Sequence, residues 1–173
     1  AKIINREQEI AGINDIGIPR LSCPTSLNGT CGTPQGAFTA DLANDTLPAY
    51  SFVTPDICND THDCSVTVGD NWLHTVLPDI FKSPAYLRGE VAIHVLYDEE
   101  EGSFIQGPIP NLFISPYVQP TISNVVINHY SALRLAESQL GITEFLGCAS
   151  GVAPGGGSCP VGSTVDIREI FNF

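Results

Sequence analysis

The stretch Val91-Ala92-Ile93-His94-Val95-Leu96-Tyr97 says most about the fold of this 173-residue sequence. It is an almost continuous apolar run, as expected for a strand that is buried on both faces of a parallel sheet. The run ends at the acidic segment Asp98-Glu99-Glu100-Glu101-Gly102. A strand buried on both faces needs helices to cover it, so the stretch predicts an α/β fold.

The neighbouring segments supply further strands and helices. Residues 49–54 alternate as a strand does and stop before Pro55, and residues 111–115 form another short strand. Asp70 is placed as the N-cap of a helix whose apolar positions run to residue 81. Pro78 predicts a kink or an early end of that helix.

A second helix is predicted from Asn128, a suitable N-cap, to Leu140, where Gly141 ends it. The alternation of strands and helices points to one α/β core at residues 47–141. Residues 1–46 read as irregular, disulfide-looped structure, and residues 142–173 as a clasped tail. Within the tail, residues 167–173 form a final strand or a docking segment.

The charge of the chain limits its partners. Nineteen acidic residues against seven basic ones give a formal net charge of -12. Such a chain repels nucleic acid and anionic lipid at long range. A phosphorylated substrate would be repelled too, so an enzyme acting on phosphate esters would need bound divalent cations.

Six cysteines fall into three close pairs, each in a loop rich in Gly, Pro or Asn. Fifteen pairings are possible, and closure between nearest neighbours is the simplest. None of the pairs has the Cys-x-x-Cys spacing of a redox or zinc site. The even number of cysteines therefore favours disulfides and a secreted or extracytoplasmic location. No run of residues has the length of a membrane span. The three pairs are Cys23/Cys31, Cys58/Cys64 and Cys148/Cys159.

Three Asn-x-Thr sequons begin at Asn28, Asn44 and Asn59. They would carry sugar only in a eukaryotic secretory host, and otherwise we expect solvated turns.

Polar side chains follow the predicted strands at three places: residues 59–63, Asp98-Glu99, and Asn128-His129. In open α/β sheets, the carboxyl ends of the strands face the ligand crevice. Carboxylate and imidazole groups suit a divalent metal that could polarise a phosphoryl oxygen. The alternative is a hydrogen-bonded turn and a solvated run of charge.

The other candidate residues read as structural. His94 lies among apolar residues and is interpreted as a core histidine, whereas His74 lies on the polar side of its helix and is expected to be solvated. Trp72 is assigned to the core.

Several motifs, in order, resemble the bacterial secreted acid phosphatases and phosphoesterases related to phospholipase C. The resemblance extends over about residues 38–141. It is carried by Leu47-Pro48-Ala49-Tyr50-Ser51-Phe52-Val53-Thr54-Pro55, Cys58-Asn59-Asp60-Thr61-His62-Asp63-Cys64, Gly69-Asp70-Asn71-Trp72-Leu73, Tyr97-Asp98-Glu99, Ile114-Ser115-Pro116-Tyr117 and Asn128-His129-Tyr130.

This resemblance implies an alkaline-phosphatase-like three-layer sandwich with a mostly parallel sheet, and metal-dependent hydrolysis of phosphate monoesters. Asp60, His62 and His129 would be ligands of one metal site, and Asp98 with Glu99 would form a second site or its near shell. The divalent ions could be Zn, Mg, Ca, Mn or Fe. Asp70 fits a family position as well as an N-cap, and a Cys58–Cys64 disulfide would hold the loop that presents His62.

One departure separates two hypotheses. The family places a Glu-Asn metal-binding motif and a Ser or Thr nucleophile in its N-terminal half, and this sequence has no Glu-Asn dipeptide. We therefore expect an N-terminal fragment or another polypeptide to complete the fold. The alternative is a non-catalytic subunit or interaction module derived from it.

Overall fold

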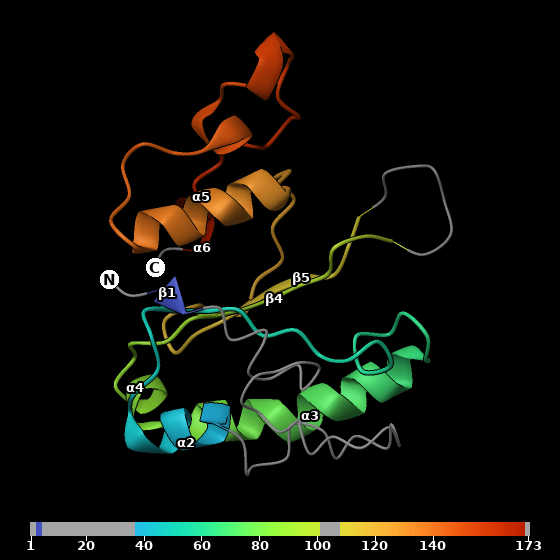
Figure 1. The fold of residues 1–173 in the computed structure, drawn as a ribbon, viewed down its shortest axis with the longest axis vertical. Coiled ribbons are helices and arrows are strands. Elements are labelled where there is room, and N and C mark those ends of the chain that lie inside the picture. Colours follow the sequence, from blue (N-terminus) through green and yellow to red (C-terminus); the bar gives the residue numbers. More distant parts are fainter. Residues whose placement is uncertain (1–2, 5–36, 101–107, 172–173) are drawn as a thin grey trace. The chain divides into compact units, whose positions relative to one another are not determined.

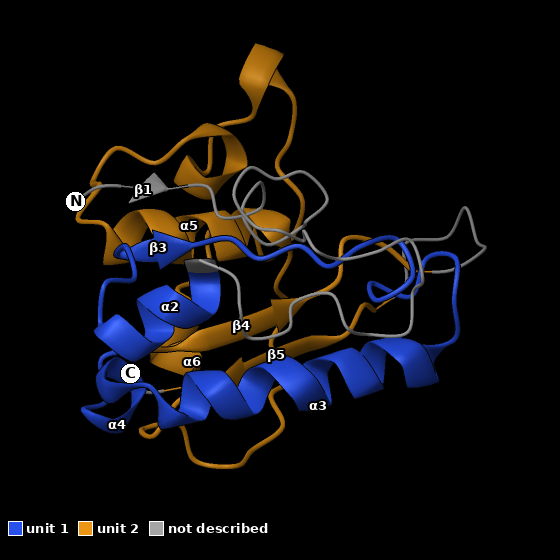
Figure 2. Ribbon diagram, turned by 60° about the horizontal axis from the view of Figure 1, so that its bottom comes forward, with its two compact units in different colours: residues 1–90 blue, residues 91–173 orange. Residues whose placement is uncertain are grey.

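The computed structural model describes residues 3–4, 37–100 and 108–171. The chain divides into two compact units, residues 1–90 and 91–173 (Figure 2). Together they mix helices with two short two-stranded sheets. Within the described stretches, no helix is long and apolar enough to cross a membrane.

The described part of the first unit is mainly helical (Figure 1). It contains helices α2 (Ala37–Asn44), α3 (Val66–Lys82) and α4 (Pro84–Leu87). Strands β1 (Ile3–Ile4) and β3 (Tyr50–Ser51) form a parallel pair. Helix α2 was not predicted, and β3 is shorter than the strand expected over residues 49–54.

In the described part of this unit, α2 contacts both α3 and α4, and α2 and α3 both carry buried apolar residues. Phe38 and Leu42 from α2, and Trp72 and Ile80 from α3, are each at most 9% exposed. Trp72 is therefore a core residue, as predicted.

Helix α3 starts earlier than predicted, and of the two expectations at Pro78, a kink or an early end, the early end does not occur. It begins after Ser65, so Asp70 lies inside the helix and is not its N-cap. It also continues through Pro78 to Lys82. Gly69 and Trp72 are both buried, three positions apart on one face, and this packing extends the helix over residues with poor intrinsic helix propensity.

The second unit contains the strand predicted from the apolar run. Strand β4 (Ile93–Leu96) pairs antiparallel with β5 (Asn111–Ile114), with Ile93 opposite Ile114. All four residues of β4 are half-buried and not fully buried. The one pairing described for this strand is therefore antiparallel, whereas the sequence favoured a parallel one.

Helix α5 (His129–Gln139) begins and ends as predicted. Asn128 caps it and Gly141, just beyond it, has a φ of 75°, a conformation that favours glycine. The tail then forms two 3-10 turns, η1 (Gly147–Ser150) and η2 (Pro154–Gly156).

The last described element is a short helix, α6 (Ile167–Phe171), and not the strand that was one of the two expectations for residues 167–173. Ile167 is fully buried, and the Phe171 ring lies 5.0 Å from that of Phe113 in β5. These apolar contacts pack α6 against the sheet of its own unit. Five residues are too few for a helical pattern to be read from sequence.

The predicted disulfides Cys58–Cys64 and Cys148–Cys159 are both present. Their Cα atoms are 4.8 and 5.4 Å apart. The third predicted pair, Cys23 and Cys31, lies outside the described residues, as does the sequon at Asn28.

Candidate functional site

In the first unit, the candidate site is the loop closed by the Cys58–Cys64 disulfide. Asp56 organises the start of this loop, because its Oδ1 accepts hydrogen bonds from the backbone N–H groups of Cys58 (3.0 Å) and Asn59 (2.9 Å). Such an Asx turn fixes the chain direction locally. The role of Asp56 was not predicted, although an Asp two residues before Cys58 is a sequence signal for this turn.

The loop presents Asp60 and His62 close together. Thr61 between them has a φ of 78°, and Asp60 Oδ1 accepts a hydrogen bond from the His62 backbone N–H at 2.8 Å. The His62 ring pairs with Asp63 through Nδ1 at 2.9 Å. A neutral His62 that donates from Nδ1 carries its lone pair on Nε2. The loop therefore offers a carboxylate and an oriented imidazole, as metal binding requires.

The sequon at Asn59 is not a solvated turn. Asn59 is 3% exposed, and its Nδ2 donates to Asp56 Oδ2 at 3.1 Å. The amide nitrogen that a sugar would modify is therefore already bonded inside the loop.

In the second unit, the candidate residues gather beyond the end of β4. Asp98 Oδ1 accepts a hydrogen bond from the Glu99 backbone N–H at 3.0 Å, and both side chains are exposed. His129, the first residue of α5, places its Nε2 3.2 Å from the Tyr97 carbonyl oxygen. The structure thus brings His129 next to the Tyr97-Asp98-Glu99 segment, 32 residues earlier in the chain.

This contact determines the tautomer of neutral His129. A carbonyl oxygen can only accept a hydrogen bond, so Nε2 carries the proton and Nδ1 keeps the lone pair. Nδ1 is therefore the atom of His129 that can bind a metal ion or accept a proton.

His94 lies near this site on β4. Its Nε2 donates to Asn111 Oδ1 at 2.8 Å, and its ring stacks on Phe113 with centroids 4.0 Å apart. Burial lowers the pKa of His94, the Asn111 hydrogen bond opposes this effect, and a smaller electrostatic repulsion between the two rings, which requires a protonated His129, also lowers the pKa. The structural role predicted for His94 fits these contacts.

Two other residues considered in the sequence lie on α3. His74 is exposed on α3, as predicted. Asp70 is an exposed residue within the same helix.

The fit of a metal ion can be tested unit by unit. Carboxylate and imidazole donors are present in each unit, and this donor chemistry suits a divalent cation. However, no group of three or more His, Cys, Asp or Glu side chains that could hold an ion exists among residues 3–4, 37–100 and 108–171. The described residues therefore offer separate carboxylate and imidazole donors that are not gathered into one group of three or more.

The chain is similar to known proteins over most of its described part. The model of the Phosphoesterase family matches residues 24–143. A phosphatidylinositol-3-phosphatase of Mycobacterium tuberculosis is 33% identical over 66% of this chain and 38% of its own length. No solved structure matches the chain.

Fungal acid phosphatases are also similar. A phosphate-repressible acid phosphatase of Penicillium chrysogenum is 24% identical, and an acid phosphatase of Aspergillus fumigatus is 26% identical. Each match covers 61% of this chain, and 26% and 24% of the respective relative. The chain thus spans well under half of the length of these relatives. Since the family match covers more than half of residues 1–173, this chain belongs to the Phosphoesterase family.

Proposed function

We propose that this chain is part of a secreted, metal-dependent phosphomonoesterase with an alkaline-phosphatase-like fold. The observation that carries the proposal is the family match across residues 24–143, which includes every candidate ligand. The relatives described above are named phosphatases. The two disulfides favour an oxidising compartment, which supports secretion.

The proposed ligands of divalent ions are the five residues predicted from the sequence. Bound ions would polarise the phosphoryl oxygens and favour attack on phosphorus. They would also offset the net charge of -12, which otherwise repels an anionic ester. The ligands are Asp60, His62, Asp98, Glu99 and His129.

The side chains of this chain would bind the divalent ions, and neighbouring groups would hold these side chains in a fixed orientation. The disulfide-closed loop holds Asp60 and His62 in one short turn, and the Tyr97 carbonyl holds the His129 ring so that Nδ1 keeps its lone pair. Orientation of ligands before substrate arrives lowers the cost of reaching the transition state. The Ser or Thr nucleophile and the Glu-Asn motif would come from outside residues 1–173.

The test is to measure hydrolysis of p-nitrophenyl phosphate by the complete protein, together with its metal content. We expect chelation to abolish activity and a divalent ion to restore it. His129→Ala should lower kcat/KM by about 100-fold or more, as expected for a lost ligand. His74→Ala is the matched control, because it removes an exposed imidazole outside the proposed site.

A complete protein that contains no metal and hydrolyses no phosphate ester would contradict the proposal. That result would favour a non-catalytic subunit or interaction module of the same family.

A further inference from the structure

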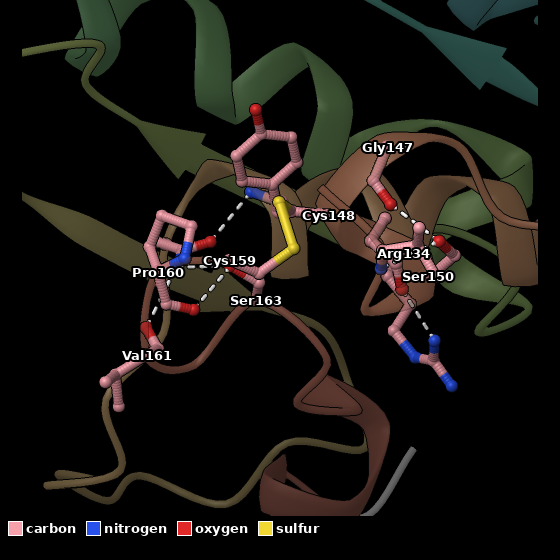
Figure 3. The surroundings of a disulfide bond; sticks show 12 residues. Arg134, Gly147, Cys148, Ser150, Cys159, Pro160, Val161 and Ser163 are labelled. Carbon is pink, nitrogen blue, oxygen red and sulfur yellow. Dashed lines mark hydrogen bonds between the residues drawn. A yellow bond between two sulfur atoms is a disulfide. The ribbon is translucent and has the colours of Figure 1, made fainter. Parts of the chain in front are cut away.

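The tail after α5 turns back onto the start of that helix. The Cys148–Cys159 disulfide closes its loop (Figure 3), and Cys148 is only 3% exposed. Turn η1, which carries Cys148, packs against α5. The family match ends at residue 143, so this closed tail lies beyond the part shared with the family model.

The tail holds one side chain at the start of α5, that of Asn128. Asn128 Nδ2 donates to the Val161 carbonyl oxygen at 2.9 Å and to Ser163 Oγ at 3.1 Å. Ser163 is 2% exposed and donates its own hydroxyl hydrogen to the Pro160 carbonyl oxygen at 2.7 Å. Pro160 directly follows Cys159, so these acceptors lie within a few residues of the disulfide.

Between the two acceptors, the backbone of the tail touches the backbone that precedes Asn128. A Cβ atom on Gly162 would lie 2.3 Å from the Val126 carbonyl oxygen, which is an impossible contact. Gly162 also has a φ of 89°. The sequence therefore allows a close approach here that a larger residue would prevent.

The other end of the same side chain fixes the first turn of α5. Asn128 Oδ1 accepts from the Tyr130 backbone N–H at 2.9 Å, and the Asn128 backbone N–H donates to Ser131 Oγ at 2.7 Å. Ser131 is fully buried. His129 lies between these residues, as the first residue of the helix, and its Nε2 contacts the Tyr97 carbonyl.

We propose that the disulfide-closed tail is a positioning element for His129, and that Asn128 is the positioning residue that connects them. The tail holds the amide of Asn128, the amide holds the first turn of α5, and that turn directs Nε2–H of His129 at Tyr97. Nδ1 then keeps its lone pair for a ligand. The inference rests on the proposed function only for what Nδ1 binds. The tautomer of His129 is a property of this chain and does not depend on that function.

The decisive variant is Asn128→Asp in the complete protein. Asp is as good an N-cap as Asn, so α5 keeps its cap. Its carboxylate cannot donate, however, so the bond to the Val161 carbonyl is lost and two oxygens face each other. Asn128→Ser, which also caps helices but has no amide, serves as a second variant should Asn128→Asp fold poorly.

Two measurements detect the effect of these variants on His129: the tautomer of its ring and the kinetics of hydrolysis. In protein labelled with ¹⁵N-histidine, the ring signals of His129, assigned with His129→Gln, report which nitrogen carries the proton. We expect wild-type protein to show the Nε2–H tautomer, and Asn128→Asp to show a mixture. With p-nitrophenyl phosphate, we expect kcat to fall about 10-fold with KM within about twofold, as for other residues that orient a ligand.

A matched pair of variants separates the tail from general stability. Cys148→Ser with Cys159→Ser should reproduce both effects. Ser150→Ala, in the same tail, removes hydrogen bonds only to Gly147 and Val152 and should change neither readout. Thermal unfolding of each variant shows that it is folded at the assay temperature.

The result that would overturn the inference is a folded Asn128→Asp protein whose His129 signals match those of Ser150→Ala. If the complete protein hydrolyses no phosphate ester but the His129 signals shift as expected, the proposed function fails and the positioning role stands. If activity is present and the signals do not shift, the positioning role fails by itself.

Discussion

At the scale of single residues, His94 shows how one partly buried imidazole makes stability depend on pH. Burial lowers its pKa below the ordinary value of 6.5. As pH falls through 6.5, the unfolded chain binds a proton at this histidine before the folded chain does. Folding is therefore favoured above that pH and is progressively weakened below it.

We predict that the free energy of unfolding of metal-free protein falls between pH 7 and pH 5, and that His94→Gln flattens this decrease. The slope attributable to one such group is at most about 1.4 kcal/mol per pH unit. Urea unfolding at several pH values measures it, with His74→Gln as the exposed control. Parallel curves for wild-type and His94→Gln protein would show that His94 does not carry the effect.

Two glycines allow a second prediction at this scale. Gly162 and Gly155 both have positive φ, but a Cβ would overlap the Val126 carbonyl only at Gly162 and would meet nothing within 4 Å at Gly155. Gly155→Ala should cost about 1 kcal/mol for backbone strain alone. Gly162→Ala should cost at least about 2 kcal/mol more, because it also pushes the tail away from the backbone of Val126. Equal losses in urea unfolding would contradict the close approach.

At the scale of secondary-structure elements, α3 and α5 show which helix ends can be predicted. The ends of α5 follow from local signals, the Asn128 cap and Gly141. The start of α3 does not, because Val66, Thr67 and Val68 have low helix propensity and the buried face at Gly69 and Trp72 determines the result. Burial of that kind depends on residues distant in the sequence, which no local pattern identifies.

Helix α3 also contains Pro78, which breaks the hydrogen-bond pattern of the last turns. An interior proline is about 3 kcal/mol less favourable than alanine in a helix. Because the fold already accommodates Pro78 within α3, replacing it should recover only part of this difference. We predict that Pro78→Ala stabilises the protein by about 1–2 kcal/mol. A lower melting temperature for Pro78→Ala than for wild type would mean that the proline ring packs better than the regained hydrogen bond.

The candidate site shows the same division between local and distant information. The loop at Asp60 and His62 and the Asp98-Glu99 turn are visible in sequence because they are contiguous. The contact of His129 with Tyr97 spans 32 residues, and that of Asn128 with Ser163 spans 35. No local pattern pairs such positions, so sequence reasoning proposed His129 as a candidate ligand but gave neither contact and did not single out Ser163.

At the scale of the whole molecule, each described disulfide closes within one compact unit. On the chain-entropy model, loops of this length stabilise a fold by about 2–3 kcal/mol each. We predict that replacing Cys58 and Cys64 by serine speeds hydrogen exchange mainly in residues 37–90, and that replacing Cys148 and Cys159 does so mainly in residues 108–171. Uniformly faster exchange after either change would show that the two units open together.

The hydrogen bonds between Asn128 and the tail determine which positions of the tail can change in sequence. Val161 contributes its carbonyl oxygen, and its side chain is 80% exposed. Nearly any residue at position 161 can therefore offer the same acceptor, whereas position 162 accepts only glycine. Saturation mutagenesis should show tolerance at 161 beside intolerance at 162. Related proteins could then conserve this contact while their tails retain almost no recognisable similarity.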